Sequence, residues 1–330
     1  MNRKVSVAPM MDCTDKHERY FLRLISKNVL LYTEMIVSEA IDRGDKKKLL
    51  SFNLEEKPVA LQIGGSSPTL LGRAAKLGED FGYDEINLNL GCPSKKVQKN
   101  KFGACLIKEP NLVVDCLEKM ISSTKLPVTV KTRIGYDDVE TYDHLYNFIE
   151  KLKSTGVKTF IIHARKAMLG KFTPKQNLNI PPLKYEMVYR LKKDFKDLEI
   201  IINGGISSVD HIKKHLESAD GVMLGRAIYH SPYLLADIEK EIFKNNEVPS
   251  RENIIEKLIP YVKNEIKKGT RINQVMRHTL GLFHGQNGSN FWKRYLSKNM
   301  CVRDADVKKI DHIMDKIKTK KFEPLEGRID

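Results

Sequence analysis

The sequence predicts an α/β fold, a (β/α)₈ TIM barrel followed by a smaller all-helical domain. Short apolar, β-rich runs recur through the first two thirds of the chain, and a segment with helical periodicity follows each of them. Eight such units fit in roughly 235 residues, which is the usual size of this barrel. After Pro232 the strand pattern stops, and helical periodicity takes over from about Asn253 to Lys318. We therefore expect a barrel domain over residues 1–240 and a helical domain over residues 241–330.

The eight expected strands are brief runs of apolar and β-branched residues, as in a parallel sheet that is buried on both faces. They are Val5–Ala8, Leu30–Thr33, Val59–Ile63, Glu85–Leu90, Val128–Lys131, Thr159–His163, Glu199–Asn203 and Gly221–Leu224. The expected helices carry apolar residues three or four positions apart, which is the period of a helix with one buried face. They cover about 15–27, 68–81, 111–123, 139–154, 183–194 and 208–217, with shorter pieces after the second and eighth strands. Spacing alone does not show that a sheet closes, so a doubly wound open sheet remains the alternative.

The composition is typical of a globular protein with a basic surface. Hydrophobic residues make up 41% of the 330 residues and charged residues 30%, which allows a packed core. There are 57 Lys and Arg against 42 Asp and Glu, so the net charge is +15 and the isoelectric point is near 9.4. Residues 246–330 hold 18 Lys and Arg against 11 Asp and Glu, an excess of 7. This balance favours a polyanionic partner such as nucleic acid, although a generally basic proteome would produce it too.

The sequence carries no sign of membrane insertion or of metal binding. It has no run of about 18 apolar residues, and its N-terminal stretch lacks the apolar core of a secretory signal, so we expect a cytoplasmic protein. The five cysteines are widely spaced and form no CxxC pair, which argues against a disulfide framework and against a zinc site. They are Cys13, Cys92, Cys105, Cys116 and Cys301. We expect no bound metal and no membrane contact, and we expect a monomer.

Glycines follow the last two expected strands, at the end of the barrel where reacting groups lie in this fold. Gly204 and Gly205 come after the seventh strand, and Gly225 and Arg226 come after the eighth. Paired glycines let backbone N–H groups approach a phosphate closely, and an arginine adds a permanent cation. These two loops form the usual phosphate site of the fold, so we expect them to bind a cofactor phosphate. A tight turn is the structural alternative for the glycine pair.

Lys131 ends an apolar strand, where an ammonium without a partner is costly, so we expect it to meet an anion. A reduced flavin carries negative charge at N1–C2=O, which such a lysine would stabilise, and Gln62 could hydrogen-bond the pyrimidine edge of the same ring. The run Pro9-Met10-Met11 offers apolar backbone and thioethers to the face of the ring. A lysine whose stem is buried and whose amine reaches solvent is the alternative.

Cys92 lies in the run Gly91-Cys92-Pro93-Ser94, in the loop after the fourth strand. Gly and Pro restrict the backbone there, so that the loop can project the thiol over the barrel mouth. A thiol is mostly protonated at neutral pH, which suits a general acid that gives a proton to a carbanion-like carbon. A nucleophilic role would need a paired histidine, and no Cys/His pattern indicates one. We expect the other four cysteines to be packing residues.

Two pairs of polar residues alternate along strands and therefore share a face. His163 and Arg165 end the sixth strand. We expect His163 to bind the cofactor phosphate or a substrate carbonyl, and Arg165 to bind the substrate or its phosphate; a structural histidine is the alternative. Asn87 and Asn89 alternate likewise, and Asn89 is the nearer of the two to Cys92. We expect the Asn89 amide to bind the substrate.

These strand ends fall in stretches that resemble the tRNA-dihydrouridine synthases over essentially the whole chain. The stretches are APMMDCTD, LQIGG, EINLNLGCPSKKVQKNKFGACL, VTVKTRIG, FIIHARKAMLGKFTPKQNLNIPPLKY, INGGI and GVMLGRAIYHSP. Seven motifs in order on successive strand ends are far more specific than a lone GCP. The stretch from His163 to Pro182 and the tail GLFHGQNGSNFWKRYLS resemble the A-type branch of the family, which modifies D-loop uridines 20 and 20a.

The resemblance implies an FMN-containing barrel and a C-terminal helical tRNA-binding domain. In this family NADPH reduces the flavin, flavin N5 gives a hydride to uracil C6, and the cysteine that matches Cys92 protonates C5. Asn89 matches a contact to the substrate nucleotide. The family's FMN contacts match Pro9, Met10, Met11, Gln62, Lys131, His163, Asn203, Gly204, Gly205, Gly225 and Arg226.

The resemblance also implies tRNA contacts in the loop 171–182 and in the basic-aromatic run 291–295. We expect contacts from Arg165, Lys175, Gln176, Asn179, Arg277, Lys293 and Arg294. Extrusion of a loop uridine costs only a few kcal/mol, and phosphate contacts would make binding depend steeply on salt. Met168 stands where this branch is expected to carry a large aromatic residue, which affects only the detail of the tRNA contact.

Two other functions are compatible with the residues. A dihydroorotate-dehydrogenase-like flavoprotein would run the same pyrimidine chemistry on a free metabolite, but it needs no basic helical extension. A tRNA-binding protein without turnover would need no reacting residues, yet Cys92, Lys131, His163 and Arg226 are all present.

Overall fold

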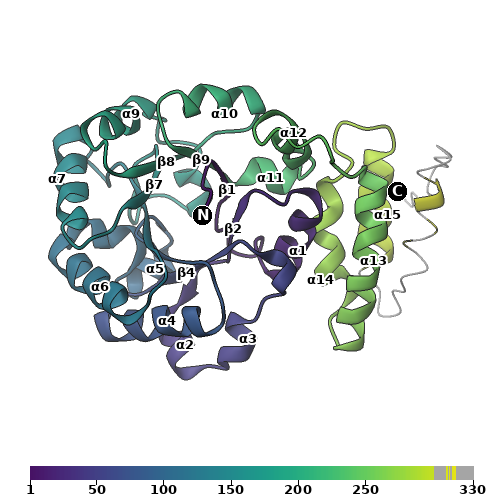
Figure 1. Ribbon diagram of the computed structural model, residues 1–330, viewed down its shortest axis with the longest axis horizontal. Coiled ribbons are helices and arrows are strands. Elements are labelled where there is room, and N and C mark those ends of the chain that lie inside the picture. The colour runs from purple at the N-terminus through teal and green to yellow at the C-terminus, as the bar shows by residue number, and fades with distance from the viewer. Residues whose placement is uncertain (301–309, 311, 313, 317–330) are drawn as a thin grey trace. The chain divides into compact units, whose positions relative to one another are not determined.

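The computed structural model describes residues 1–300, 310, 312 and 314–316. Within them, eight parallel strands form a closed barrel, and β1 pairs with both β2 and β9 while β2 also pairs with β4. The strands are β1 (Val5–Val7), β2 (Leu30–Tyr32), β4 (Val59–Gly64), β5 (Glu85–Asn89), β6 (Val128–Arg133), β7 (Thr159–His163), β8 (Glu199–Asn203) and β9 (Gly221–Leu224). This closure confirms the expected TIM barrel and excludes the open sheet (Figure 1).

Helices surround the strands of the barrel in Figure 1. The helices of the barrel unit are α2 (Ser38–Arg43), α3 (Lys46–Leu50), α4 (Pro68–Asp80), α5 (Lys95–Lys99), α6 (Pro110–Ser123), α7 (Tyr142–Lys153), α8 (Pro174–Asn177), α9 (Tyr185–Asp194) and α10 (Val209–Leu216), with the 3₁₀ turns η1 (Leu54–Glu56) and η2 (Gly103–Lys108). Side-chain caps begin several of them. The Ser67 hydroxyl accepts from the Leu70 N–H at the start of α4, and Thr141 accepts from the His144 N–H at the start of α7.

Five strands end one or two residues away from their expected ends, and one short strand is additional; two of these differences bear on the site. The strand β6 continues two residues past Lys131, because Thr132 and Arg133 still pair with Ile162 and His163 of β7. The two-residue strand β3 (Ile36–Val37) pairs with the carboxyl end of β4 and was not expected. The first difference brings Arg133 to the end of the barrel that carries the candidate site.

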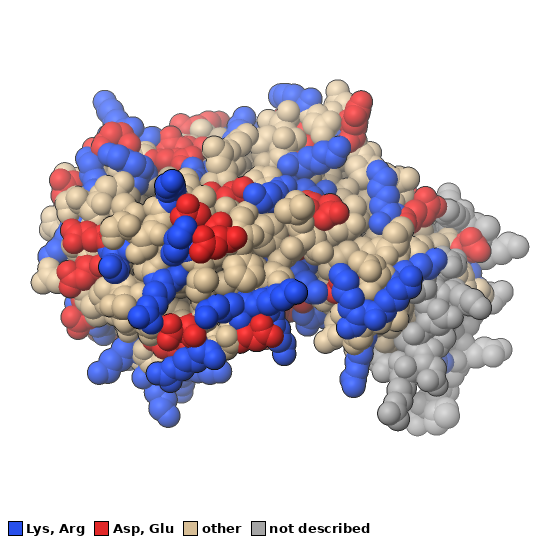
Figure 2. Space-filling model, turned by 60° about the horizontal axis from the view of Figure 1, so that its bottom comes forward, with Lys and Arg blue, Asp and Glu red and all other residues tan. Residues whose placement is uncertain are grey.

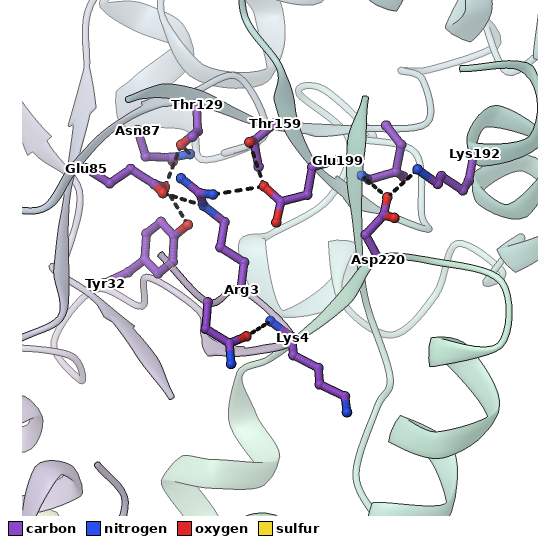
Figure 3. A network of polar contacts seen from close by, with 12 residues as sticks. Arg3, Lys4, Tyr32, Glu85, Asn87, Thr129, Thr159, Lys192, Glu199 and Asp220 are labelled. Atoms are coloured by element: carbon purple, nitrogen blue, oxygen red, sulfur yellow. Dashed lines mark hydrogen bonds and ion pairs between the residues drawn. The ribbon is translucent and has the colours of Figure 1, made fainter. Parts of the chain in front are cut away.

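The barrel interior contains an apolar layer and, at the amino ends of the strands, a polar network. The layer is a buried cluster of Ala8, Leu30, Tyr32, Ala60, Ile161, Ile201 and Met223. In the network, Arg3 donates to Glu85 Oε2 at 2.7 Å and to Glu199 Oε2 at 2.9 Å (Figure 3). The hydroxyls of Tyr32 and Thr129 also donate to Glu85, and the hydroxyl of Thr159 donates to Glu199. The charges of this network are therefore paired with one another.

The described residues group into two compact units, one made of Met1–Lys16 with Val29–Gly225 and the other of His17–Asn28 with the chain from Arg226 onward. The second unit is helical. It contains α1 (Lys16–Ile25), α11 (Arg226–His230), α12 (Leu234–Glu241), α13 (Arg251–Lys267), α14 (Ile272–Met276), η3 (Arg277–Gly281) and α15 (Ser289–Asn299). Whether residues 1–240 and 241–330 fold as separate domains stays a prediction.

The helical unit has its own core and its own polar ties. Trp292 is fully buried, and its indole N–H donates to the Thr279 carbonyl at 2.9 Å. Helix α1 joins this unit because His17 Nδ1 lies 2.7 Å from the Tyr261 hydroxyl of α13. None of the described helices is both long and apolar enough to cross a membrane. Cys301 and the end of the expected helical stretch lie outside the described residues.

Candidate active site

Lys131 and Asn203 meet at the carboxyl ends of the barrel strands. The Lys131 ammonium donates to Asn203 Oδ1 at 2.9 Å, and Asn203 Nδ2 donates to the Met223 carbonyl at 2.7 Å. His163 is paired in register with Asn203 across β7 and β8, so all three side chains belong to the same end of the barrel. The structure therefore brings together three of the residues that the sequence assigns to a flavin.

The barrel mouth holds buried positive charge whose partners are amide and carbonyl oxygens. Burial, followed by the charge of the neighbouring Arg133, lowers the pKa of Lys131 to about 7. Arg133 is 4% exposed, and burial lowers the pKa of its guanidinium to about 10. Its Nε donates to the Gly91 carbonyl at 2.8 Å, and one of its terminal nitrogens donates to the Lys166 carbonyl at 3.1 Å. Such a site favours an anionic ligand, since within the described part of the chain the hydrogen-bond partners of both groups are amide and carbonyl oxygens rather than carboxylates.

Arg133 was missed in the sequence because the expected strand ended at Lys131. The signal that could have found it is alternation, since residues two apart in a strand share a face. Arg133 also joins two loops, because its hydrogen bonds reach the Gly91 carbonyl after β5 and the Asn177 carbonyl of α8. Asn177 is itself fully buried, and its side chain bonds both the N–H and the carbonyl of Met168. These hydrogen bonds connect the loop that carries the expected tRNA contacts to the carboxyl end of β6.

Asn89 holds the loop that carries Cys92. Its Oδ1 accepts from the backbone N–H of Gly91 at 3.1 Å and from that of Cys92 at 3.0 Å. Its Nδ2 donates to Gln62 Oε1 at 2.9 Å, so the two amides expected to bind substrate and flavin contact each other. Asn89 is 8% exposed and Gln62 1%, so hydrogen bonds to other protein groups, rather than to solvent, orient both side chains.

Cys92 is the half-buried member of a tightly packed loop. Its carbonyl accepts from the Ala104 N–H at 3.0 Å, beneath Gly103, whose φ of +74° suits a glycine. Of the other described cysteines, Cys116 is buried, and Cys13 and Cys105 are half-buried. Burial raises the pKa of Cys116 to about 12, and burial raises the pKa of Cys105, whose thiol donates to the Phe102 carbonyl.

The glycine pair after β8 adopts a backbone that other residues rarely adopt. Gly204 has φ +122° and Gly205 has φ +71°. The Tyr185 hydroxyl donates to the Gly204 carbonyl at 2.7 Å, and a Cβ on Gly204 would lie 2.9 Å from a Leu183 methyl. The pair therefore forms a tight turn in which Gly204 is buried and Gly205 is exposed, and its role in binding a phosphate stays a prediction.

The residues after β1 and β9 lie close together. A Cβ built on Gly225 would lie 3.4 Å from Met10 Sδ, and the Met10 N–H donates to the Thr14 hydroxyl. Pro9 is half-buried, whereas Met11 is 57% exposed. Arg226 begins α11 and belongs to the helical unit, so its role beside Gly225 stays a prediction.

The expected tRNA contacts of the barrel unit lie on an ordered loop. Arg165 donates to the Pro181 carbonyl, and its backbone N–H donates to His163 Nδ1 at 3.2 Å. Lys175, Gln176 and Asn179 are exposed. The Gln176 side chain accepts from the Thr173 N–H as the cap of α8, so it also serves the loop's own structure.

The helical unit presents basic residues and buries its aromatic ones. Arg277 and Arg294 are exposed and Lys293 is half-exposed. The aromatic members of the run 291–295 point into the core, with Phe291 at 8%, Trp292 at 0% and Tyr295 at 8% exposure. The basic residues of this run are therefore available to phosphates, whereas its rings are not available to stack on bases.

A basic segment begins three residues after Cys92. Lys95, Lys96, Lys99 and Lys101 are all exposed on α5 and the turn after it. Figure 2 shows how Lys and Arg side chains are spread over one face of the molecule with Asp and Glu between them. Among the described residues no group of three or more His, Cys, Asp and Glu side chains could hold a metal ion.

Comparisons with known proteins show which proteins the chain is similar to. Proteins named tRNA-dihydrouridine(20/20a) synthase are similar to the chain in Synechocystis sp. (52% identity, covering 91% of this chain and 90% of that one), Shewanella oneidensis (47%, 97% and 95%) and Escherichia coli strain K12 (48%, 96% and 92%). A 2-naphthoyl-CoA reductase structure shares the fold alone, with a TM-score of 0.53 and 12% identity over 76% of this chain and 51% of that chain. Because the sequence model described as Dihydrouridine synthase (Dus) matches residues 6–318, the chain belongs to the dihydrouridine synthase family.

Proposed function

We propose that the chain reduces the C5–C6 double bond of D-loop uridines 20 and 20a in tRNA, using bound FMN that NADPH reduces, in the cytoplasm. The observation that carries the proposal is the barrel mouth. It holds Cys92, an asparagine that binds the backbone of the Cys92 loop, and a half-buried lysine whose hydrogen-bond partner is an amide oxygen. The names of the relatives supply the substrate class, because they act on positions 20 and 20a of tRNA.

The residues present fit FMN. The flavin ring would meet Lys131, Gln62 and Met10, and its phosphate would meet the backbone of Gly204 and Gly205. Buried cations with carbonyl partners suit the negative charge that a flavin gains on reduction. Bound there, FMN would supply the hydride that uracil C6 receives. Pro9, Met11, His163, Asn203, Gly225 and Arg226 complete the proposed contacts.

The chain's own residues would place the uracil and supply the proton. Cys92 would hold, at Sγ, the proton that C5 receives. The Asn89 side chain would keep the loop of Cys92 in place by accepting a hydrogen bond from the Cys92 backbone N–H. The half-buried position of the thiol suits a group that must reach a base and yet be shielded from bulk water. Arg133 would hold this loop against the loop after β7, since it bonds carbonyls in both.

Basic residues in each unit support a tRNA partner. In the barrel unit, the four lysines of α5 and its turn lie within nine residues of Cys92. Arg165 and Lys175 belong to the connection that follows β7. In the helical unit, Arg277, Lys293 and Arg294 are accessible. Phosphate contacts of this kind are independent of base sequence, so binding should weaken steeply as salt rises.

The test is dihydrouridine formation by the purified protein on tRNA that lacks the modification, read by mass spectrometry. The protein should bind flavin and form dihydrouridine in the D loop. Cys92→Ala should abolish or severely slow product formation while NADPH still bleaches the flavin absorbance. Cys105→Ala, in the same connection between β5 and α6, is the matched control and should keep activity. A colourless protein that does not take up FMN would overturn the proposal, and equal turnover in C92A would overturn the role of Cys92.

The family assignment argues against both other functions. A dihydroorotate-dehydrogenase-like enzyme would oxidise its reduced flavin with free orotate or uracil, so these compounds belong in the same assay. We expect only tRNA to reoxidise the flavin.

A further inference from the structure

Five buried side chains form a continuous series of hydrogen bonds from the base of the barrel to the loop of Cys92. We name it the interior series; its members are Glu85, Thr129, Asn87, Gln62 and Asn89, each 8% exposed or less. Thr129 Oγ1 donates to Glu85 Oε1 at 2.6 Å, and Asn87 Nδ2 donates to Thr129 Oγ1 at 2.8 Å. Gln62 Nε2 then donates to Asn87 Oδ1 at 2.8 Å, and Asn89 Nδ2 donates to Gln62 Oε1 at 2.9 Å. The series ends where Asn89 Oδ1 accepts from the Cys92 N–H.

The two ends of the series fix the direction of every bond in it. Glu85 is a carboxylate held by Arg3 at 2.7 Å, so it only accepts, and the backbone N–H groups of Gly91 and Cys92 only donate. Each amide between them must therefore present its oxygen toward the Cys92 end and its nitrogen toward the Glu85 end. Figure 3 shows the start of the series, with Glu85, Thr129 and Asn87 beside Arg3 and Tyr32.

This direction decides what the site amides can offer to a ligand. Asn89 Oδ1 already accepts two hydrogen bonds, so only one N–H of Asn89 remains. Gln62 keeps one N–H and one oxygen lone pair, because each end of its amide is used once. If the Asn89 amide were reversed, two backbone N–H groups would face an NH₂ group, and the loop of Cys92 would lose its attachment.

We propose that Glu85 and Thr129 are positioning residues, which act through Asn87 and Gln62 to orient the Asn89 amide and the loop of Cys92. The inference rests on the proposed function. Glu85 and Asn89 lie four residues apart on β5, a distance of about 13 Å along the strand, so neither Glu85 nor Thr129 touches the reacting atoms. The remaining Asn89 N–H makes the site a hydrogen-bond donor toward a pyrimidine carbonyl.

The barrel contains a matched pair of threonines for the test. Thr129 and Thr159 are both buried near the base, and each donates to a glutamate that Arg3 also binds, Glu85 for Thr129 and Glu199 for Thr159 at 2.8 Å (Figure 3). Only Thr129 belongs to the interior series. Thr129→Val removes both of its bonds in the series without changing side-chain shape, and Thr159→Val makes the same chemical change beside it.

We expect T129V to lower kcat for tRNA about tenfold relative to T159V, since a buried amide is left without its acceptor. Thr129→Ser should restore it. The second readout is the ¹H–¹⁵N spectrum of the side-chain amides in protein labelled at Asn and Gln, where the Asn89 and Gln62 signals should shift in T129V and not in T159V.

Equal kcat values and equal amide spectra in T129V and T159V would overturn the inference. If T129V does not fold, Thr129→Ala and Thr159→Ala replace the valine pair under the same criteria. Failure of the proposed function is a different result, in which the wild-type protein forms no dihydrouridine; the amide spectra still decide the inference then.

Discussion

Lys131 should make the stability of the flavin-free protein depend on pH in the alkaline range. Its pKa falls from an ordinary 10.5 to about 7, chiefly because the ammonium is buried. Between these values the unfolded chain binds a proton that the folded protein does not bind, so stability rises as pH rises. The full effect is about 5 kcal/mol, because each pKa unit corresponds to about 1.4 kcal/mol. From pH 7 to pH 10 it amounts to roughly 3 to 4 kcal/mol.

The perturbation is Lys131→Met, which keeps an unbranched side chain and removes the charge. Loss of the hydrogen bond to Asn203 lowers the stability of the variant by the same amount at every pH. Only the wild type has the Lys131 ammonium, so only its stability changes with the titration of that group. The stability of the wild type should therefore rise relative to that of the variant by about 3 to 4 kcal/mol between pH 7 and pH 10. Urea unfolding at several pH values measures this difference. Lys125→Met, at an exposed lysine, is the matched control.

A constant difference between wild type and K131M across this range would refute the reasoning, since it would mean that Lys131 keeps an ordinary proton affinity in the folded protein. If the stability difference between wild type and K131M changes as expected from pH 7 to pH 10, its size also measures the free energy that an anionic ligand could recover at this site. An anion beside the ammonium offsets the penalty of burying that charge.

Three further results follow from the structure. Gly204→Ala should cost about 2 kcal/mol or more and weaken flavin retention, because alanine is strained at φ +122° and its Cβ would meet Leu183; unchanged urea midpoint and flavin content would contradict this. Trp292→Ala should destabilise the helical unit by about 3 to 5 kcal/mol in thermal unfolding followed by circular dichroism, since the ring is fully buried. The double substitution Lys293→Gln and Arg294→Gln should lower the log–log slope of tRNA affinity against salt by about 1.5, and an equal slope would remove both residues from the interface.

The fold was predictable because the pattern repeats. Strand-forming runs and helical segments alternate eight times, and the ends of the strands could be read to within one or two residues. The family resemblance was equally readable, since its motifs are contiguous stretches of sequence that lie at strand ends. The order of residues therefore indicated Cys92, Lys131 and the glycine pair as site residues before any contact was known.

Other features depend on which strands become neighbours. Alternation could place Asn87 and Asn89 on one face, but only the pairing of β4 with β5 and of β5 with β6 brings Gln62 and Thr129 between them. Alternation with Lys131 could have pointed to Arg133, but the carbonyls that Arg133 binds belong to two other loops that only the fold brings near it. The aromatic run 291–295 was expected near tRNA, and the packing of the helical unit turned its rings inward.

The sequence by itself determined the α/β barrel and the family, and it predicted the chemical type of the site, because these depend on local patterns and on residue identity. Only the tertiary structure decided which amide faces which, how the loop of Cys92 is held, and that a lysine and an arginine share a buried mouth. Hydrogen-bond direction and burial are properties of groups that are distant in the chain, and they arise when the barrel closes.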